Sequence, residues 1–494
     1  MSSIGNRTAI LTLSRLANYG LLLISPIVLA RLLSVAEFGR YREFLLYATM
    51  LQTVALFSIN DSLLYFVPAY PASPWRVARH AAVLTLISSV AVVGAVAVVD
   101  ISMGGTLLHG FLLPLAAFTL FCVNLDFWES FWIARGRPGA VFIYSACRLL
   151  GRLATTVATA VFTRNVDSII RSLVIFEGAR MVLSGAAFLA MSRTRREPPL
   201  VEPYRELLRF CIPSGLAALL GMLNKNLTSL VVARVLGVSA LARYSVGRFG
   251  EPIVLTLRSS VSSVVLPEMV RKGQSERAGP LALWRRATVI NTIFLFPIVV
   301  FVARYAQPLI VFAFGESYRG SAIVMQLYML VVIRECFDFA PALRAIGQTR
   351  PLVGSNLLAV VACVAGLFLL IPRAGVAGAM GAFVIGSFVD VSYLAWRTAR
   401  AYGAELHRIV PWASVGKVGL AALAASSFII SSIWTDTFGI AGVVLAGAMY
   451  CAVFALLLLA LRVPEVLVLL EWARALLFRR ASQAGHQISG RAGR

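Results

Sequence analysis

The sequence predicts an all-α integral membrane protein. Its 494 residues are 59% hydrophobic and only 14% charged, with a mean hydropathy of +0.83, whereas a soluble domain carries about 25% charged residues. A membrane-crossing helix needs about 20 mostly apolar residues, and residues 81–99 and 437–461 supply such runs without a single charge. A helix that is apolar on all sides over this length belongs in a bilayer rather than in a soluble core.

Hydropathy divides the chain into about fourteen predicted spans. The first segment is longer than the apolar core of a signal peptide, contains Arg15 and leads directly into further spans, so we predict a transmembrane helix there. The spans are predicted at about 8–33, 41–69, 77–99, 107–134, 140–163, 168–191, 205–236, 241–267, 286–305, 319–343, 351–371, 374–396, 411–434 and 438–461.

Lysine and arginine concentrate in the loops of one side. If the N-terminus lies inside, the inner loops and tails hold 26 of these residues and the outer loops hold 3. Because basic loops remain in the cytoplasm, both termini are expected there, which for a bacterial cell means the inner membrane. Much of the net charge of +23 then faces anionic headgroups of the cytoplasmic leaflet rather than a nucleic acid. Residues 462–494 are expected to form a cytoplasmic tail, amphipathic at first and then disordered.

One line of sequence occurs twice. "ARLLSVAEFGRY" at 30–41 matches "ARVLGVSALARY" at 233–244 with an offset of 203, and "WIARGRP" at 132–138 is echoed by "AIGQTRP" at 345–351. Both copies run in the same direction, which predicts two pseudo-symmetric six-helix lobes around a central cavity, related by an axis along the membrane normal. The predicted parts are a first lobe at 1–200, a second lobe at 201–403, two helices outside the duplication at 404–461, and the tail.

Four segments of this pattern resemble a known family. "VLARLLSVAEFGRY", "FGESYRGSAIVMQLYML", "ALRAIGQTRP" and "LLIPRAGVAGAMGAFVIG" are similar to the polysaccharide-exporter branch of the MOP superfamily, whose fold is shared with MATE transporters. This branch holds the Wzx-type flippases of lipid-linked oligosaccharides. The resemblance implies that spans 1, 2, 7 and 8 line the central cavity.

Charged residues inside those spans are the candidate substrate-binding residues. On a continuous span 8, Arg248, Glu251 and Arg258 recur at helical spacing and would share one face with Tyr244 and Ser262. The resemblance implies a positive cavity, suited to a pyrophosphate because guanidinium groups bind phosphate oxygens in pairs. Two alternatives stay open: Glu251 neutralises a neighbouring arginine, and Arg42 extends to the outer headgroups. The predicted cavity set is Arg15, Asn18, Arg42, Asn224, Lys225, Arg248, Glu251 and Arg258.

A second group of charges is expected to form internal ion pairs. Asp126 and Glu129 lie at a depth similar to that of Arg148 on the next span, while Glu177 with Arg180 and Arg334 with Asp338 have helical spacing. Asp61 and Asp390 have no obvious partner in the sequence. They are the candidates for H⁺ or Na⁺ coupling, with a satisfied hydrogen bond as the alternative explanation.

The resulting functional prediction is a flippase rather than an enzyme. It would move an undecaprenyl-pyrophosphate type oligosaccharide lipid from the inner to the outer leaflet by alternating access, for exopolysaccharide, O-antigen or capsule assembly. Membrane lipids, and a polysaccharide polymerase with chain-length proteins, are the expected partners. No catalytic residue, metal or cofactor is expected, since the six cysteines show no CxxC spacing and no GxxxxGK[ST] occurs. The alternatives are a lipid II flippase, a multidrug extruder and, less favoured, a polytopic glycosyltransferase or polymerase.

Overall fold

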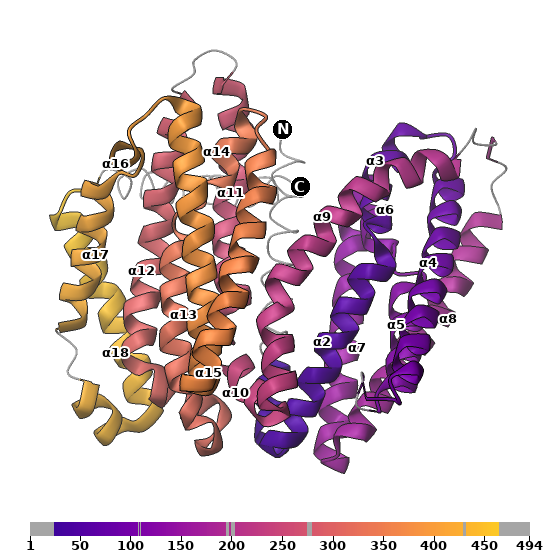
Figure 1. Cartoon of the computed structure of the whole chain (residues 1–494), viewed down its shortest axis with the longest axis horizontal. Helices are drawn as coiled ribbons and strands as arrows, with labels where there is room; N and C mark the ends of the chain where they lie inside the picture. Colours follow the sequence, from indigo (N-terminus) through magenta and orange to yellow (C-terminus); the bar gives the residue numbers. More distant parts are fainter. Residues whose placement is uncertain are drawn as a thin grey trace, which may run out of the picture. The chain divides into compact units, whose positions relative to one another are not determined.

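A computed structural model describes residues 24–106, 108, 110–193, 197–198, 203–273, 279–427 and 431–463. All regular secondary structure in these ranges is helical (Figure 1). Within them, ten helical stretches are long and apolar enough to cross a membrane. The longest, α15 (Arg350–Tyr402), covers two predicted spans and is interrupted at Gly375, at the start of the second, where φ is 53° and ψ is −125°. The all-α membrane fold is therefore confirmed.

The helices form two compact units. The first contains the described residues up to Phe249 together with Ala313–Ser321 and Leu367–Met380. After a helical segment at 24–32, its helices are α2 (Val35–Leu56), α3 (Ile59–Ala69), α4 (Pro74–Ser102), α5 (Leu112–Val123), α6 (Trp128–Ala134), α7 (Pro138–Thr163), α8 (Val166–Arg193), α9 (Pro203–Val231), a π-helical turn at Val232–Leu236 and α10 (Val238–Gly247).

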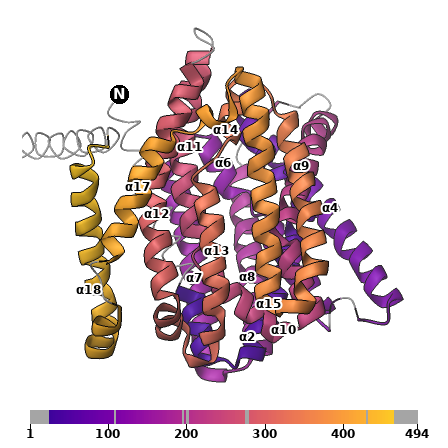
Figure 2. The same cartoon turned by 60° about the vertical axis from the view of Figure 1, so that its left-hand side comes forward.

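The second unit contains Gly250–Phe312, Ala322–Gly366 and the described residues from Gly381 onward. Its helices are α11 (Glu251–Gly273), most of α12 (Gly279–Phe314), α13 (Ala322–Glu335), α14 (Ala340–Ala345), the two outer parts of α15, α16 (Leu406–Ile409), α17 (Trp412–Ser427) and α18 (Ser431–Ala460). Figure 2 shows α18 beside α17, and buried apolar side chains of both pack with α12.

Within the described residues, four predicted spans are not single helices. The span predicted at 41–69 breaks between α2 and α3, where Phe57 and Ser58 have φ values of 41° and 59°. The span predicted at 107–134 breaks between α5 and α6, where Leu125 has a φ of 56°. The span at 319–343 breaks between α13 and α14, and the span at 241–267 breaks between α10 and α11. The last break follows from sequence, because Pro252 has no N–H to donate to the carbonyl of Arg248 and would therefore interrupt a continuous helix.

The two copies of the repeat pack together inside the first unit, where α2 contacts α10. The matched arginines make corresponding contacts: Arg31 Nε donates to the carbonyl of Ala313 at 3.0 Å, and Arg234 Nη1 donates to the carbonyl of Thr106 at 3.2 Å. Each copy therefore holds the main chain of a connection that comes from the other half of the sequence.

An aromatic core fixes the region where α3, α4, α6 and α9 meet. Trp75 on α4 packs against Phe131 on α6 with ring centroids 4.7 Å apart, and both side chains are buried. Leu207 and Cys211 on α9 belong to the same apolar cluster. Burial of this cluster holds the first turns of α9 beside the last turns of α3.

Candidate functional site

The structure divides the predicted cavity residues between the two units. Arg42 lies on α2, Asn224 and Lys225 lie on α9, and Arg248 follows α10, all in the first unit. Glu251 and Arg258 lie on α11 in the second unit. Arg15 and Asn18 lie outside the described residues. The prediction that Arg248, Glu251 and Arg258 share one face of a continuous helix is wrong, because residues 248–250 form a turn.

Arg248 and Lys225 have different surroundings. Arg248 is buried at 7% exposure, its Nη1 donates to the Tyr244 hydroxyl at 3.1 Å, and its guanidinium lies 5.4 Å from that ring's centroid. Lys225 is exposed, and among the described residues it makes no hydrogen bond or ion pair. Lys225 therefore has an ammonium group available to an anion, whereas Arg248 already contributes to packing.

Arg258 belongs to a charged network of the second unit. Its Nη1 lies 2.8 Å from Glu335 Oε2, and its Nε lies 3.8 Å from Asp338 Oδ2. Ser262, one turn further along α11, donates to Asp338 Oδ2 at 3.1 Å. The partners of Arg258 are thus carboxylates of the α13–α14 region, so the charge of this arginine is already compensated.

Arg334 extends the same network to α15. It donates to Glu335 Oε1 at 2.8 Å and also pairs with Asp390. Two predictions are therefore wrong: Asp390 has a close partner, and the ion-pair partners of Arg334 are Glu335 and Asp390 rather than Asp338. Asp390 lies 56 residues from Arg334, so sequence spacing could not reveal this pair.

The second-unit network carries unequal charge. It joins two guanidinium groups to three carboxylates, which leaves one negative charge in excess when all are ionised. Its side chains are between 10% and 27% exposed. An uncompensated charge in such a place is costly, and binding of one proton or monovalent cation would neutralise it.

A balanced network occupies the first unit. Arg148 Nη1 donates to both oxygens of Asp126 at 2.7 Å, and Arg180 Nε donates to Glu177 Oε2 at 2.6 Å. Both predicted pairs are confirmed, while Glu129 is exposed. The acids occupy related sequence positions in the two networks, since Asp126 and Asp338 are 212 residues apart and Glu177 and Asp390 are 213 apart.

Arg180 also caps the break between α5 and α6. Its Nη2 donates to the carbonyl of Phe121 at 2.6 Å and to that of Cys122 at 3.0 Å, and Nη1 reaches the carbonyl of Leu125 at 3.4 Å. Carbonyls at a helix end have no intrahelical donor, so this one side chain satisfies groups that the bilayer could not. The other coupling candidate, Asp61, is exposed on α3.

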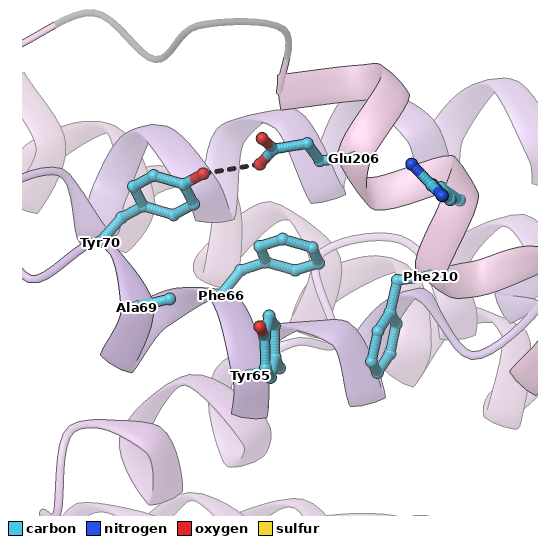
Figure 3. A pocket seen from close by; sticks show the side chains of 7 residues that line it. Tyr65, Phe66, Ala69, Tyr70, Glu206 and Phe210 are labelled. Atoms are coloured by element: carbon cyan, nitrogen blue, oxygen red, sulfur yellow. Dashed lines mark hydrogen bonds between the residues drawn. The ribbon is translucent and has the colours of Figure 1, made fainter.

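A pocket lies where the end of α3 faces the start of α9 (Figure 3). Its volume is about 420 Å³. The Tyr70 hydroxyl donates to Glu206 Oε2 at 2.6 Å, and the rings of Tyr65 and Phe210 are stacked with centroids 5.7 Å apart. The hydrogen bond to the Glu206 carboxylate, together with desolvation, raises the pKa of Tyr70 above its ordinary value.

Sequence reasoning missed this pocket. Its lining is Tyr65, Phe66, Ala69, Tyr70, Glu206, Arg209 and Phe210. The signal was present, since "YFVPAY" ends one predicted span and "YRELLRF" begins another. Aromatic residues at span ends are usual in membrane proteins, so the pattern alone did not single them out.

Within the described residues, no three His, Cys, Asp or Glu side chains are placed to hold a metal ion.

Comparisons with known proteins agree with this fold. The profile of a family described as "Polysaccharide biosynthesis protein" matches residues 28–323. No curated protein matches the sequence. Among solved structures, the lipid II flippase MurJ in an inward closed conformation superposes with a TM-score of 0.68 at 13% identity, covering 90% of this chain and 98% of MurJ.

Two further structures have the same fold. An inward-facing multidrug resistance MATE transporter of the MOP superfamily gives a TM-score of 0.54 at 14% identity, over 80% of this chain and 99% of that one. A MOP superfamily transporter from Pyrococcus furiosus, described as having a binding pocket of reversed polarity, gives 0.52 at 15% identity, over 79% and 93%. The fold is that of MOP transporters.

Proposed function

The chain belongs to the polysaccharide biosynthesis protein family, with a MOP-superfamily fold, and from this premise we propose that it is a flippase for a polyprenyl-pyrophosphate-linked oligosaccharide. The observation that carries the proposal is the family match over residues 28–323. The substrate would pass from the inner to the outer leaflet of a bacterial inner membrane, for polysaccharide assembly at the cell surface. A polymerase and chain-length proteins would act on the product.

The exposed cation on α9 supports a pyrophosphate ligand. Lys225 offers an ammonium group that no described side chain neutralises, and Asn224 beside it adds an amide donor. We place Arg42, Arg15 and Asn18 in the same substrate set on the strength of the resemblance. Arg248 and Arg258 have protein partners, and we propose that they stabilise the end of α10 and the contact of α11 with α13 respectively.

The unequal network of the second unit supports ion coupling. We propose that Asp390 and its neighbours bind one proton or Na⁺ during transport, since the network holds one carboxylate more than its arginines balance. Asp61 remains the alternative coupling residue. We also propose a division into two lobes, at residues 1–200 and 201–403, with 404–461 outside the duplication; the sequence repeat supports it. The charges of the loops support the proposal that both termini are cytoplasmic.

Leaflet accessibility tests the function directly. Purified protein is placed in liposomes that contain undecaprenyl-pyrophosphate oligosaccharide, and the rate at which the inner pool reaches an external sugar-modifying enzyme is followed. We expect fast transfer by the wild type, strongly reduced transfer by Lys225→Ala at unchanged thermal stability, and normal transfer by the control Lys272→Ala, which removes an exposed lysine near the end of α11.

The outcomes separate the alternatives. Transfer of lipid II but not of other oligosaccharide lipids would identify a lipid II flippase, which shares the pyrophosphate chemistry. Failure with every pyrophosphate lipid, under imposed H⁺ and Na⁺ gradients, would refute the proposal. Extrusion of cationic drugs by the same preparation would then indicate a multidrug transporter. Arg248→Ala is expected to lower thermal stability, because it removes the charged hydrogen bond to the buried Tyr244 hydroxyl.

A further inference from the structure

The pocket between α3 and α9 combines features that suit a sugar ring, and it is separate from the charged networks. Its seven lining residues come from the last turns of α3 and the first turns of α9, with Tyr70 just beyond α3. Its volume of about 420 Å³ falls within the range of small-ligand sites, roughly 300–1,000 Å³. Neighbouring packing holds it in place, since Phe66 and Phe210 contact edge to face at 5.8 Å.

The pocket lies at a membrane boundary. Ala69 is the last residue of one candidate span, and Tyr204 is the first residue of another. The connections that follow and precede them, 70–80 and 192–204, belong to the loops predicted to be cytoplasmic because they are rich in arginine. The sugars of a lipid-linked oligosaccharide anchored in the inner leaflet would lie at this boundary between membrane and cytoplasm.

The chemistry of the lining matches a pyranose. One face of the Tyr65 ring stacks on Phe210, and since the residue is 60% exposed, apolar ring surface remains open to the C–H groups of a pyranose. Glu206 is also exposed. Its Oε2 accepts from Tyr70, and its second oxygen can accept a sugar hydroxyl. Figure 3 shows the aromatic side chains and the carboxylate around one space.

A phospholipid headgroup is the competing occupant, and the lining disfavours it. A carboxylate at Glu206 repels a lipid phosphate, and the repulsion is strong near a low-dielectric boundary. Arg209 attracts an anion, but it is exposed on the same helix, so it can bind the pyrophosphate or an acidic sugar outside the aromatic part of the pocket. A neutral hydroxyl-rich ring uses the aromatic face and the carboxylate together.

We propose that this pocket is a sugar subsite that receives a hexose ring of the lipid-linked substrate on the cytoplasmic side. This inference rests on the proposed flippase function and adds a location for saccharide recognition. Tyr65 supplies the stacking face, Glu206 accepts hydroxyl hydrogen bonds, and Tyr70 orients the Glu206 carboxylate.

The test compares variants in the liposome assay at varied substrate concentration. Tyr65→Leu and Glu206→Gln are expected to raise the half-saturating concentration of the oligosaccharide lipid about tenfold each, as the loss of one stacking contact or one charged hydrogen bond implies. The maximal rate should change little. Tyr65→Phe keeps the ring, so its half-saturating concentration should rise much less than that of Tyr65→Leu. Undecaprenyl phosphate, which has no sugar, should bind all variants equally.

Two controls keep a general defect from counting as support. Leu64→Ala changes an exposed neighbour on α3 that does not line the pocket, and Glu268→Gln removes an exposed carboxylate on α11. Each variant is checked for a monodisperse profile and wild-type thermal stability. Equal half-saturation in wild type, Tyr65→Leu and Glu206→Gln would overturn the subsite while leaving the flippase intact.

A direct binding measurement covers failure of the transport assay. Saturation-transfer NMR with free glucose, galactose, mannose and N-acetylglucosamine, on wild type and Tyr65→Leu, tests the pocket without transport. A signal in wild type that Tyr65→Leu abolishes supports the subsite even if the substrate lipid was chosen wrongly. No signal with any of these sugars in a preparation that transports nothing overturns it. Loss of anionic-vesicle binding by the variants, with sugar binding unchanged, would identify a headgroup anchor and also overturn it.

Discussion

Gly39 lies directly against the main chain of Val238. A β-carbon built on Gly39 would lie 2.1 Å from the carbonyl oxygen of Val238 and 2.6 Å from its carbonyl carbon. The two residues belong to the two copies of the repeated segment, so the close approach is between equivalent stretches of the duplicated chain. Only a residue without a side chain fits at this contact, because the obstacle is backbone rather than a flexible side chain.

We expect Gly39→Ala to separate α2 from α10. Overpacking of this kind usually costs about 1–3 kcal/mol, which outweighs the gain of about 1 kcal/mol from replacing a helical glycine by alanine. The apparent melting temperature in detergent, followed by fluorescence-detected size exclusion, should fall. Gly94→Ala is the matched control, since nothing lies within 4 Å of its added carbon, and it should be neutral or stabilising. Equal melting of Gly39→Ala and wild type would show that the contact does not form.

The matched arginines of the repeat give a second prediction. Arg31→Gln and Arg234→Gln each remove a charged donor from a main-chain carbonyl, of Ala313 and Thr106 respectively. We expect each to loosen the contact between α2 and α10 by about 1 kcal/mol, since both side chains are exposed. The measurement is maleimide labelling of a cysteine placed at Val238, after the exposed cysteines Cys147 and Cys451 are replaced by serine.

Labelling should be faster in either arginine variant than in the control Arg171→Gln, which removes an exposed arginine from α8. Because the two arginines hold different main-chain segments beside the paired repeat copies, their effects should add, and the double variant should exceed either single one. Identical labelling rates in all four proteins would mean that the repeated arginines do not stabilise this end of the unit.

Which features the sequence could predict depends on where their causes lie. The pair of Glu177 and Arg180 was predictable because helical spacing of three residues brings the side chains together. The break at 124–127 was not, because no glycine or proline marks it. Leu125 has a φ of 56°, which is unfavourable for a branched apolar residue, and Arg180 stabilises it from a helix more than fifty residues away.

The break at 248–250 had a visible cause that the periodic charges concealed. The sequence "FGEP" places a glycine and a proline just after the end of α10. The spacing of Arg248, Glu251 and Arg258 nevertheless predicted that these three residues lie on one face of a continuous helix. Helical periodicity describes a helix only if the backbone remains helical. The true partners of Arg258 and Asp390 come from α13 and its C-terminal end, and no local pattern encodes such contacts.

Arg180 offers a sharp test of the capped break. Lysine at this position keeps the charge but has a single nitrogen, so it cannot donate to Glu177 and to the carbonyls of Phe121 and Cys122 in the same geometry. We expect Arg180→Lys to destabilise the protein by about 2 kcal/mol, as loss of the hydrogen bonds to buried carbonyls implies. Hydrogen exchange at 121–127 should accelerate. Arg171→Lys on the same helix should leave both measurements unchanged, and slow exchange at 121–127 in Arg180→Lys would contradict the capping role.

The excess carboxylate of the second unit predicts how transport depends on the driving ion. Asp390 pairs with Arg334 on α13, Arg334 also pairs with Glu335, and Glu335 and Asp338 both lie against Arg258 on α11. Asp390→Asn removes one negative charge and brings the network to neutrality, so no ion is required to balance it. In proteoliposomes, transport by wild type should rise with an imposed proton or Na⁺ gradient, whichever ion couples, whereas transport by Asp390→Asn should be slow and insensitive to both. Asp61→Asn changes an exposed residue of α3, and its transport should keep the wild-type dependence on the gradient. If Asp61→Asn instead loses the gradient dependence and Asp390→Asn keeps it, the coupling site lies on α3 and the network around Asp390 has a structural role.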